Sequence, residues 1–420
     1  MNRFLFALLL ITGSASAQDV LIRHATVNTA SIRGTLKDAD VLVQGGIIRA
    51  VGPGLAAPAG VTVVDAQGKF LTPGLFGGFS DIGLEEVSAE DSTVDESLAL
   101  GGENQPPQMR PEFDVTLAYN PDSDLLPVAR LGGLTFTALT ANSSTSLIAG
   151  QGGSVRLDGD VRGQILGQRL LFVSLGSGAH GVSGGSRAAQ YMLLDQALRE
   201  ARGLAPYGTP NTLLTPTGRE TLARYLVSGR IVFSVDRAAD IRQVLAFCRK
   251  NALHPLLIGV TEGWRVAAEL KAADATVFVD ALQNLPDDFD KLGARLDNAA
   301  LLQRAGVKVA IFSSGHDSHN ARKIRQIAGN AVANGLPWEA GLESITRIPA
   351  QALGLGDKLG RIEPGLIADL VLWDGDPLEV STLAQQMWMA GKSMPLRSRQ
   401  TELRDRYMAP AGELPRAYSH

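Results

Sequence analysis

Short apolar runs alternate with longer amphipathic segments through the middle of this sequence, and no other feature constrains its fold as strongly. Apolar runs that alternate with helices indicate a parallel sheet covered by helices on both faces. With residues 75–79 as the first run and an irregular strand near Val155, the number of strands reaches about eight, as in a closed barrel. The pattern therefore predicts an α/β fold, a distorted (β/α)8 barrel. The other apolar runs span residues 136–139, 170–175, 231–235, 256–260, 275–279 and 307–312, and amphipathic helices are expected at 186–202, 237–251 and 263–273.

Both ends of the chain have a different pattern. Residues 19–70 and 359–391 mix alternating apolar and polar positions with turn-forming glycines and prolines, which is typical of short strands. We therefore expect the two ends to form one small composite β-sandwich domain. The predicted boundaries are 18–72 and 358–394 for this β domain, 73–357 for the barrel, and 395–420 for a C-terminal tail.

Composition excludes some classes of function. The formal net charge is −4 and aromatic residues make up 5% of the chain, so the basic, aromatic-rich surface of a nucleic-acid-binding protein is not expected. The single cysteine, Cys248, lies in a helical pattern and cannot pair within the chain. We expect a buried thiol there, and stability from an apolar core and not from disulfides.

The first 17 residues resemble a secretory signal. A short positive start is followed by the apolar run 4–11 and by the small residues Ala15-Ser16-Ala17. Cleavage after Ala17 would deliver the mature chain to the periplasm or the cell exterior; a retained anchor is the alternative. No other stretch approaches the roughly 20 apolar residues of a membrane-spanning helix, so no span is expected after the signal is removed.

Three motifs resemble the amidohydrolase superfamily. VLVQGGIIRAVG (41–52), VVDAQGKFLTPGL (63–75) and GRIEPGLIADLVLWDGDPL (360–378) look like the β domain and its junctions with the barrel. Residues 297–354 are similar to the last strand and helices of the imidazolonepropionase-like branch. The resemblance implies a hydrolase of C–N bonds other than peptide bonds.

The resemblance also implies a metal centre, and this sequence departs from it. In the superfamily, a His-x-His pair ends the first barrel strand, single histidines end the fifth and sixth, and an Asp follows the eighth. Here Phe79 and Asp81 stand at the His-x-His positions, Ser234 at the fifth-strand position and Gly259 at the sixth. We therefore expect that the binuclear metal site is lost, that no cofactor is bound, and that the chain is a pseudoenzyme, a binding or partner subunit.

A reduced catalytic site is the alternative. Asp81, His316, Asp317 and His319 could meet at the barrel mouth, with Asp317 or His316 at the eighth-strand position, either without metal or around a single zinc ion. Carboxylates and polar groups at other strand ends would bind substrate beside them; these are Ser234, Asp236, Arg237, Thr261, Glu262 and His319.

A binding module for small molecules is the third hypothesis. The glycine-rich segment 176–181 follows an apolar strand in the pattern G-x-G-x-x-G, but no acidic residue ends a second strand about 20 residues on, as a dinucleotide site requires. We expect instead a loop at the barrel mouth, with Ser186 capping the next helix. The expected partners are a small ligand and either a second copy of the chain or an active amidohydrolase relative.

Overall fold

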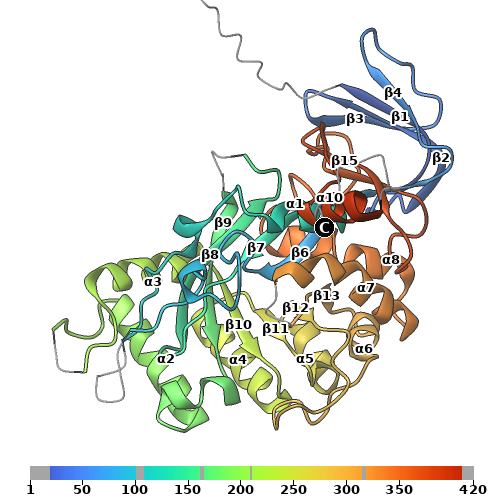
Figure 1. Ribbon diagram of the computed structural model, residues 1–420. Helices are drawn as coiled ribbons and strands as arrows, with labels where there is room; N and C mark the ends of the chain where they lie inside the picture. Colours follow the sequence, from blue (N-terminus) through green and yellow to red (C-terminus); the bar gives the residue numbers. More distant parts are fainter. Residues whose placement is uncertain (1–18, 101–107, 161–164, 209–210, 315–317, 409–420) are drawn as a thin grey trace, which may run out of the picture.

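The structure is a computed structural model that describes residues 19–100, 108–160, 165–208, 211–314 and 318–408. It contains a barrel and a smaller β domain, which lies at the upper right of Figure 1. The barrel sheet has eight strands that follow each other in chain order: β6 (Leu75–Ser80), β7 (Leu134–Leu139), β8 (Ile148–Arg156), β9 (Ile165–Ser174), β10 (Arg230–Val235), β11 (Leu256–Gly259), β12 (Thr276–Val279) and β13 (Lys308–Ile311).

One strand of the barrel corrects the prediction of a parallel sheet. Strand β8 is antiparallel to both β7 and β9, whereas every other neighbouring pair in this sheet is parallel. The connections on either side of β8 are short and contain no helix among the described residues. A parallel crossover needs a dozen or more residues, so these connections can only form hairpins.

The barrel closes without a hydrogen-bonded pair between β6 and β13 in the sheet. The backbone N–H of Phe76 on β6 donates to the carbonyl of Ile345, and the N–H of Ile311 on β13 donates to the carbonyl of Ser344. Residues 344–345 therefore bridge the two edge strands. We call this two-residue bridge the seam.

Helices cover the outer side of the barrel sheet (Figure 1). In α4 (Ala238–Asn251) the side chains of Ile241, Val244 and Cys248 are buried against the sheet, so the predicted buried thiol is confirmed. Burial in this apolar layer raises the pKa of the Cys248 thiol to about 12. The other helices are α1 (Leu125–Leu131), α2 (Arg187–Ala201), α3 (Pro216–Ser228), α5 (Ala267–Ala272), α6 (Asn298–Arg304), α7 (Ile324–Ala333), α8 (Trp338–Glu343) and α9 (Arg347–Ala352).

The second sheet combines both ends of the chain. Its strands run in the order β16 (Lys392–Met394), β15 (Ala384–Met389), β14 (Leu370–Trp373), β5 (Phe70–Pro73), β1 (Val20–Asn28), β2 (Thr35–Gln44) and β3 (Ile47–Gly52), and β4 (Thr62–Asp65) pairs with β1. N-terminal β5 lies between N-terminal β1 and C-terminal β14. The predicted fold class, a distorted barrel with a β domain formed from both ends, is confirmed.

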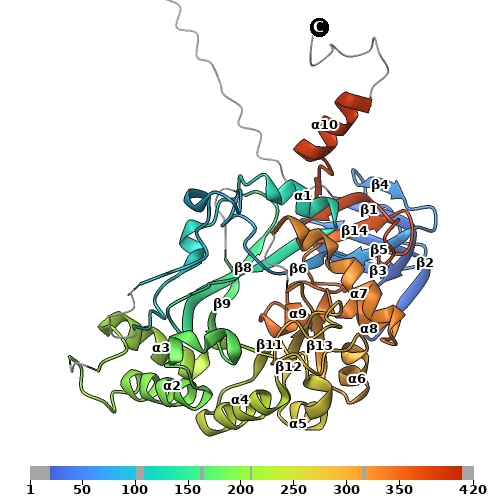
Figure 2. The same cartoon turned by 60° about the horizontal axis from the view of Figure 1, so that its bottom comes forward.

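Trp373 holds the two parts together. Its indole N–H donates to Thr72 Oγ1 over 2.9 Å, its ring lies beneath the Arg325 guanidinium at 5.4 Å, and it approaches Gly133 before β7. Beyond this domain, α10 (Arg399–Met408) buries none of its residues and stands away from the body in Figure 2. Within the described residues, no helix is both long and apolar enough to cross a bilayer. The predicted signal peptide lies outside the described residues.

Candidate functional site

A ring of short polar side chains lines the C-terminal ends of the barrel strands. We call these six residues the polar ring: Asp81, Thr140, Ser174, Ser234, Asp280 and Ser314. Each stands two residues after an interior-facing apolar residue of the same strand or the segment that follows it, namely Phe79, Ala138, Phe172, Val232, Phe278 and Phe312. Side chains two residues apart on a strand share a face, so the polar ring forms the layer above this apolar layer.

The polar ring surrounds a cavity of about 330 Å³ at the barrel mouth. Phe79 lies at its base, with its ring centroid 4.8 Å from that of Phe278 and 5.9 Å from that of Phe172, both in edge-to-face contact. The cavity therefore has an aromatic base and a polar rim, the usual composition of a pocket for a small organic molecule.

Asp81 is the most perturbed group in the cavity. The residue is only 6% exposed, and its Oδ1 has no hydrogen-bond partner among the described residues. Burial, reinforced by the nearby charges of Glu96 and Glu85, raises the pKa of Asp81 to about 8. The carboxyl is therefore mostly protonated at neutral pH and can donate or accept a proton there.

Asp236 and Thr261 form a second polar cluster on the rim. Asp236 Oδ1 accepts hydrogen bonds from Thr261 Oγ1 (2.6 Å) and from the Thr261 N–H (3.2 Å). Burial raises the pKa of Asp236. Gly259 permits this arrangement, because its φ is +93° and a Cβ there would lie 2.6 Å from the same carboxylate oxygen.

Asp280, at the end of β12, has its own fixed partners. One carboxylate oxygen accepts from the Ser314 hydroxyl (2.6 Å) and backbone N–H (3.1 Å), and the other accepts from the Leu282 N–H (2.9 Å). These bonds connect the segments after β12 and β13 across the rim. Asp280 is thus held by the protein in a way that Asp81 is not.

Two of the predicted mouth residues form their hydrogen bonds at the start of α4 and not in the cavity. Glu262 accepts from the Ala238 N–H at the start of α4, and Arg237 pairs with Asp240 on the first turn of that helix. Neither lines the cavity. The difference arises because strand-end position alone does not decide which of two adjacent polar residues points inward: Asp236 and Thr261 do, and their neighbours turn outward.

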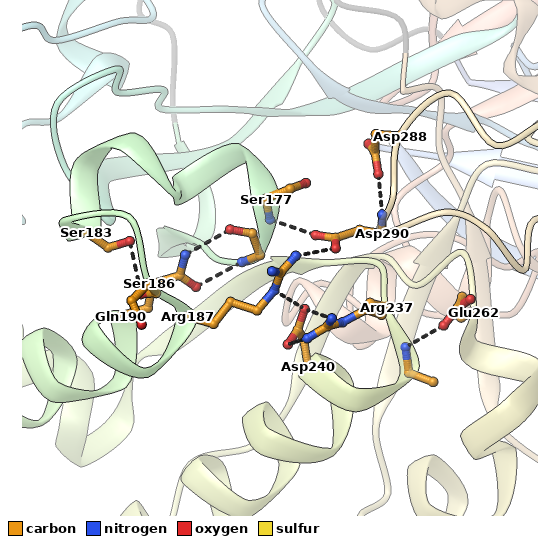
Figure 3. A network of polar contacts seen from close by, with 12 residues as sticks. Ser177, Ser183, Ser186, Arg187, Gln190, Arg237, Asp240, Glu262, Asp288 and Asp290 are labelled. Atoms are coloured by element: carbon orange, nitrogen blue, oxygen red, sulfur yellow. Dashed lines mark hydrogen bonds and ion pairs between the residues drawn. The ribbon is translucent and has the colours of Figure 1, made fainter.

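A buried ion-pair network stands beside these residues (Figure 3). Arg187, the first residue of α2, pairs with Asp240 of α4 and with Asp290 of the segment after β12. Asp290 also accepts from the Ser177 N–H (2.6 Å). Burial opposes its ionisation, but this hydrogen bond and the charges of Arg187 and Arg237 hold the pKa of Asp290 below its ordinary value. The network fixes the glycine-rich segment that follows β9.

Ser186 shows a smaller departure from prediction. Helix α2 begins directly after it, as expected, but the Ser186 side chain makes no capping hydrogen bond. The first residue of α2 is the ion-paired Arg187. The glycine-rich segment contains two short 3₁₀ turns and is not the start of a long helix.

The residues predicted for a reduced catalytic site are not all in one place. Asp81 lines the cavity, whereas His319 is exposed on the 3₁₀ helix Ser318–Lys323 and does not line it. His316 and Asp317 lie outside the described residues. The backbone N–H of Asp81 donates to Ser318 Oγ over 3.0 Å, so the segment after β13 does reach the end of β6.

The donor set that the described residues give the cavity does not fit the superfamily's binuclear centre. The positions that the resemblance gives to ligands hold Phe79, Asp81, Ser234 and Gly259, and the Phe79 ring packs tightly against its neighbours. Among the described residues, no group of three His, Cys, Asp or Glu side chains could hold a metal ion. Catalytic zinc usually needs three protein ligands.

Sequence reasoning missed several residues of the cavity. Thr140, Ser174, Ser314 and Lys291 line it, and none was singled out. A usable signal was present for the first three, since each follows an interior apolar residue by two positions near a strand end. Lys291 comes from an irregular segment after β12, where the sequence has no periodicity to indicate direction.

Comparison with known proteins gives a consistent result for the fold. Residues 208–395 match the model of the amidohydrolase family. Two relatives are similar over short segments: an amidohydrolase of Hapsidospora irregularis (41% identical, 19% of this chain, 8% of that protein) and an imidazolonepropionase of Mesorhizobium japonicum (37% identical, 18% of this chain, 19% of that protein). The chain thus matches less than a fifth of the length of each.

A solved structure covers much more of the chain. The amidohydrolase from Thermotoga maritima aligns with a TM-score of 0.78 over 90% of this chain and 100% of its own, with 23% sequence identity. At this identity the likeness concerns the fold and carries no information about the substrate. The arrangement of barrel and β domain is therefore shared by both proteins.

Proposed function

We propose, on the premise that this chain belongs to the amidohydrolase superfamily, that it retains the superfamily's barrel-mouth cavity without the binuclear metal centre. In this proposal it binds a small molecule in the cavity and serves as a binding or partner subunit, not as a metal-dependent hydrolase. Its predicted signal peptide would place it in the periplasm or outside the cell.

The aromatic base of the cavity is the observation that carries this proposal. Phe79 occupies the first of the two positions at which the superfamily has its His-x-His ligands, and it packs edge to face on Phe172 and Phe278. A zinc–nitrogen bond is about 2.0–2.1 Å long, and a phenyl ring offers no lone pair to form one. The packed rings support an apolar base for an organic ligand at this place.

Metal content tests this proposal directly. The mature protein would be purified after growth with added zinc and manganese and analysed by inductively coupled plasma mass spectrometry, beside a His316→Ala/Asp317→Ala variant. We expect background metal in both proteins. Near-stoichiometric metal in the wild type that disappears in the variant would overturn the proposal and support the reduced, single-metal hydrolase.

A metal-free hydrolase is the second candidate, and the raised pKa of Asp81 favours it. A carboxyl with a pKa of about 8 can act as a general acid or base near neutral pH. If the chain hydrolyses amides in this way, activity in the presence of a chelator should depend on pH with an inflection near 8, and Asp81→Asn should remove it. A screen of cyclic and linear amides with chelator present would detect such activity.

The partner role has structural support at the rim. The segment after β12 exposes four large apolar side chains, Leu282, Leu285, Phe289 and Leu292, and its Gln283 and Lys291 line the cavity. We propose that an active amidohydrolase relative covers this apolar rim segment. Because the segment borders the cavity, such a partner would also contact the bound ligand.

A further inference from the structure

Three buried polar atoms at and beside the cavity have no partner among the described residues: Asp81 Oδ1, Thr140 Oγ1 and Glu96 Oε2. Asp81 and Thr140 both line the cavity. They come from neighbouring parallel strands whose last paired residues are Ser80 and Leu139, so they stand side by side at the next position. A buried oxygen without a hydrogen bond is costly, which indicates that a donor from a ligand completes this corner.

The charges of the cavity indicate the sign of the charge on that ligand. Its lining contains the carboxyl groups of Asp81, Asp236 and Asp280 and one cation, Lys291. Lys291 is already engaged by Asp287 (3.2 Å) and Asp288 (3.6 Å) on its own segment. Glu85 and Glu96 add negative charge beside Asp81. At a pH above the pKa of Asp81, the described cavity therefore has more negative than positive charge to offer a ligand.

The aromatic base favours a cation as well. Aromatic faces attract ammonium groups electrostatically, and the attraction grows when the site is shielded from water. Asp81 directly follows β6 and stands two residues after Phe79, and both side chains line the cavity, so an aromatic ring and a carboxyl lie in successive layers at this corner. Their combination suits an organic cation with an apolar body better than it suits a bare metal ion.

We infer that the mouth cavity binds a small organic ammonium ion, with the charged nitrogen at Asp81 and Thr140 and the apolar body on Phe79 and Phe172. The inference rests on the proposed binding function and names its ligand class. Asp81 accepts the N–H bonds of the ammonium group in this arrangement. The Thr140 hydroxyl provides a second acceptor from the adjacent strand.

Benzylamine and benzyl alcohol test this assignment, because the two probes have almost the same shape and differ in charge. Isothermal titration calorimetry would compare them with the full mature chain at a pH just above the pKa of Asp81. We expect benzylamine to bind at least about tenfold more tightly than benzyl alcohol, since hydrogen bonds to charged groups are the stronger ones.

Two variants complete the experiment. Asp81→Asn keeps the shape of the side chain and removes its charge, and it should weaken benzylamine binding by about tenfold or more while weakening benzyl alcohol binding much less. Asp195→Asn, which removes a carboxylate from an exposed pair with Lys250 on the outer surface, should leave both affinities unchanged.

Three outcomes would overturn the inference: equal affinity for the two probes, unchanged benzylamine affinity in Asp81→Asn, or no binding of benzylamine. Equal affinity would still leave a ligand-binding cavity in place. The proposed loss of the metal centre is decided separately by the metal analysis. Failure of the ligand class and failure of the proposed function are thus distinguishable.

Discussion

Asp81 combines two properties that conflict in a folded protein, namely deep burial and the absence of a fixed partner. Asp280, on the same rim, is satisfied by Ser314 and by a backbone N–H, whereas Asp81 Oδ1 has no hydrogen-bond partner among the described residues. Ligand-binding residues often destabilise a protein that holds no ligand, because their hydrogen-bond partners belong to the ligand. Asp81 is therefore expected to weaken the fold when the cavity holds no ligand.

Asp81→Asn should stabilise the unliganded protein, and increasingly so as the pH rises. The pKa of Asp81 is raised from 3.8 to about 8 on folding, so its stabilising contribution is complete below its unfolded pKa and is lost as the pH rises through about 8. Asparagine does not titrate. Thermal unfolding should show little difference near pH 4 and a gain of about 3 to 5 kcal/mol above pH 8.

Asp195→Asn is the matched control for that measurement, since Asp195 lies in an exposed ion pair. It should change stability by less than about 1 kcal/mol at every pH. A pH-independent difference between Asp81→Asn and the wild type would contradict the raised pKa.

The sequence predicted several residues of this site but not their electrostatic properties. The resemblance predicted Asp81 and Ser234 at the mouth, strand-end position predicted Asp236 and Thr261 there, and all four line the cavity. The sequence could not predict the raised pKa of Asp81, because it depends on burial and on the charges of Glu96 and Glu85, which come from a segment without regular periodicity.

At the scale of elements, Gly133 shows how tightly the two domains meet. It has a φ of +82°, and a Cβ there would lie 2.3 Å from Cη2 of Trp373. Gly133→Ala should therefore destabilise the protein by about 2 to 4 kcal/mol, from backbone strain and from displacement of the Trp373 ring. Chemical denaturation followed by tryptophan fluorescence would measure the change.

A control variant at Gly203 separates backbone strain from displacement of the Trp373 ring. Its φ is +70°, but a Cβ there would meet nothing within 4 Å. Gly203→Ala should cost only about 1 kcal/mol, the cost of the left-handed backbone alone. Similar losses in the two variants would show that the contact with Trp373 is unimportant.

The ion pairs of Figure 3 connect α2, α4 and the segment after β12 beside the glycine-rich segment 176–181. Arg187→Ala would leave Asp240 and Asp290 buried without this partner and should cost about 2 to 4 kcal/mol. We also expect faster proteolytic cleavage within residues 176–185 under native conditions. Arg242→Ala removes an exposed pair with Glu269 and should cost less than about 1 kcal/mol without exposing that segment.

The elements were predictable wherever periodicity is strong, as in α4, and less so where direction had to be inferred. Residues 148–156 have no such periodicity, since glycines at 150, 152 and 153 interrupt the strand. Only the short connections on both sides of β8 determine that it runs antiparallel, whereas the alternating pattern predicts a parallel sheet.

At the scale of the whole molecule, the apolar rim segment predicts where a partner protein binds. Phe289 is 84% exposed and Leu285 69%, so their replacement should hardly affect folding. If this surface binds an amidohydrolase relative, Leu285→Ser/Phe289→Ser should abolish co-purification with that relative after co-expression, as judged by size-exclusion chromatography with light scattering. Val227→Ser, which alters an exposed apolar side chain on α3, should leave the complex intact.

Self-association of the wild type alone that is lost in the double variant would assign the same surface to a second copy of the chain. A complex that survives the double variant would contradict the proposed interface. The oligomeric state is in either case a property of the whole molecule that no single motif of the sequence determines.

The pairing of β5 with β14 also determines how late in translation the β domain can complete its sheet. Thr72 and Trp373 are 301 residues apart, so at about 5–20 residues per second a ribosome adds the second strand roughly 15 to 60 seconds after the first. Until then β5 has an open edge, and the seam at residues 344–345 is missing from the barrel. The nascent chain therefore stays incomplete for almost the whole of translation. If residues 1–17 act as the secretory signal that we propose, this delay would keep the chain from completing its fold before export.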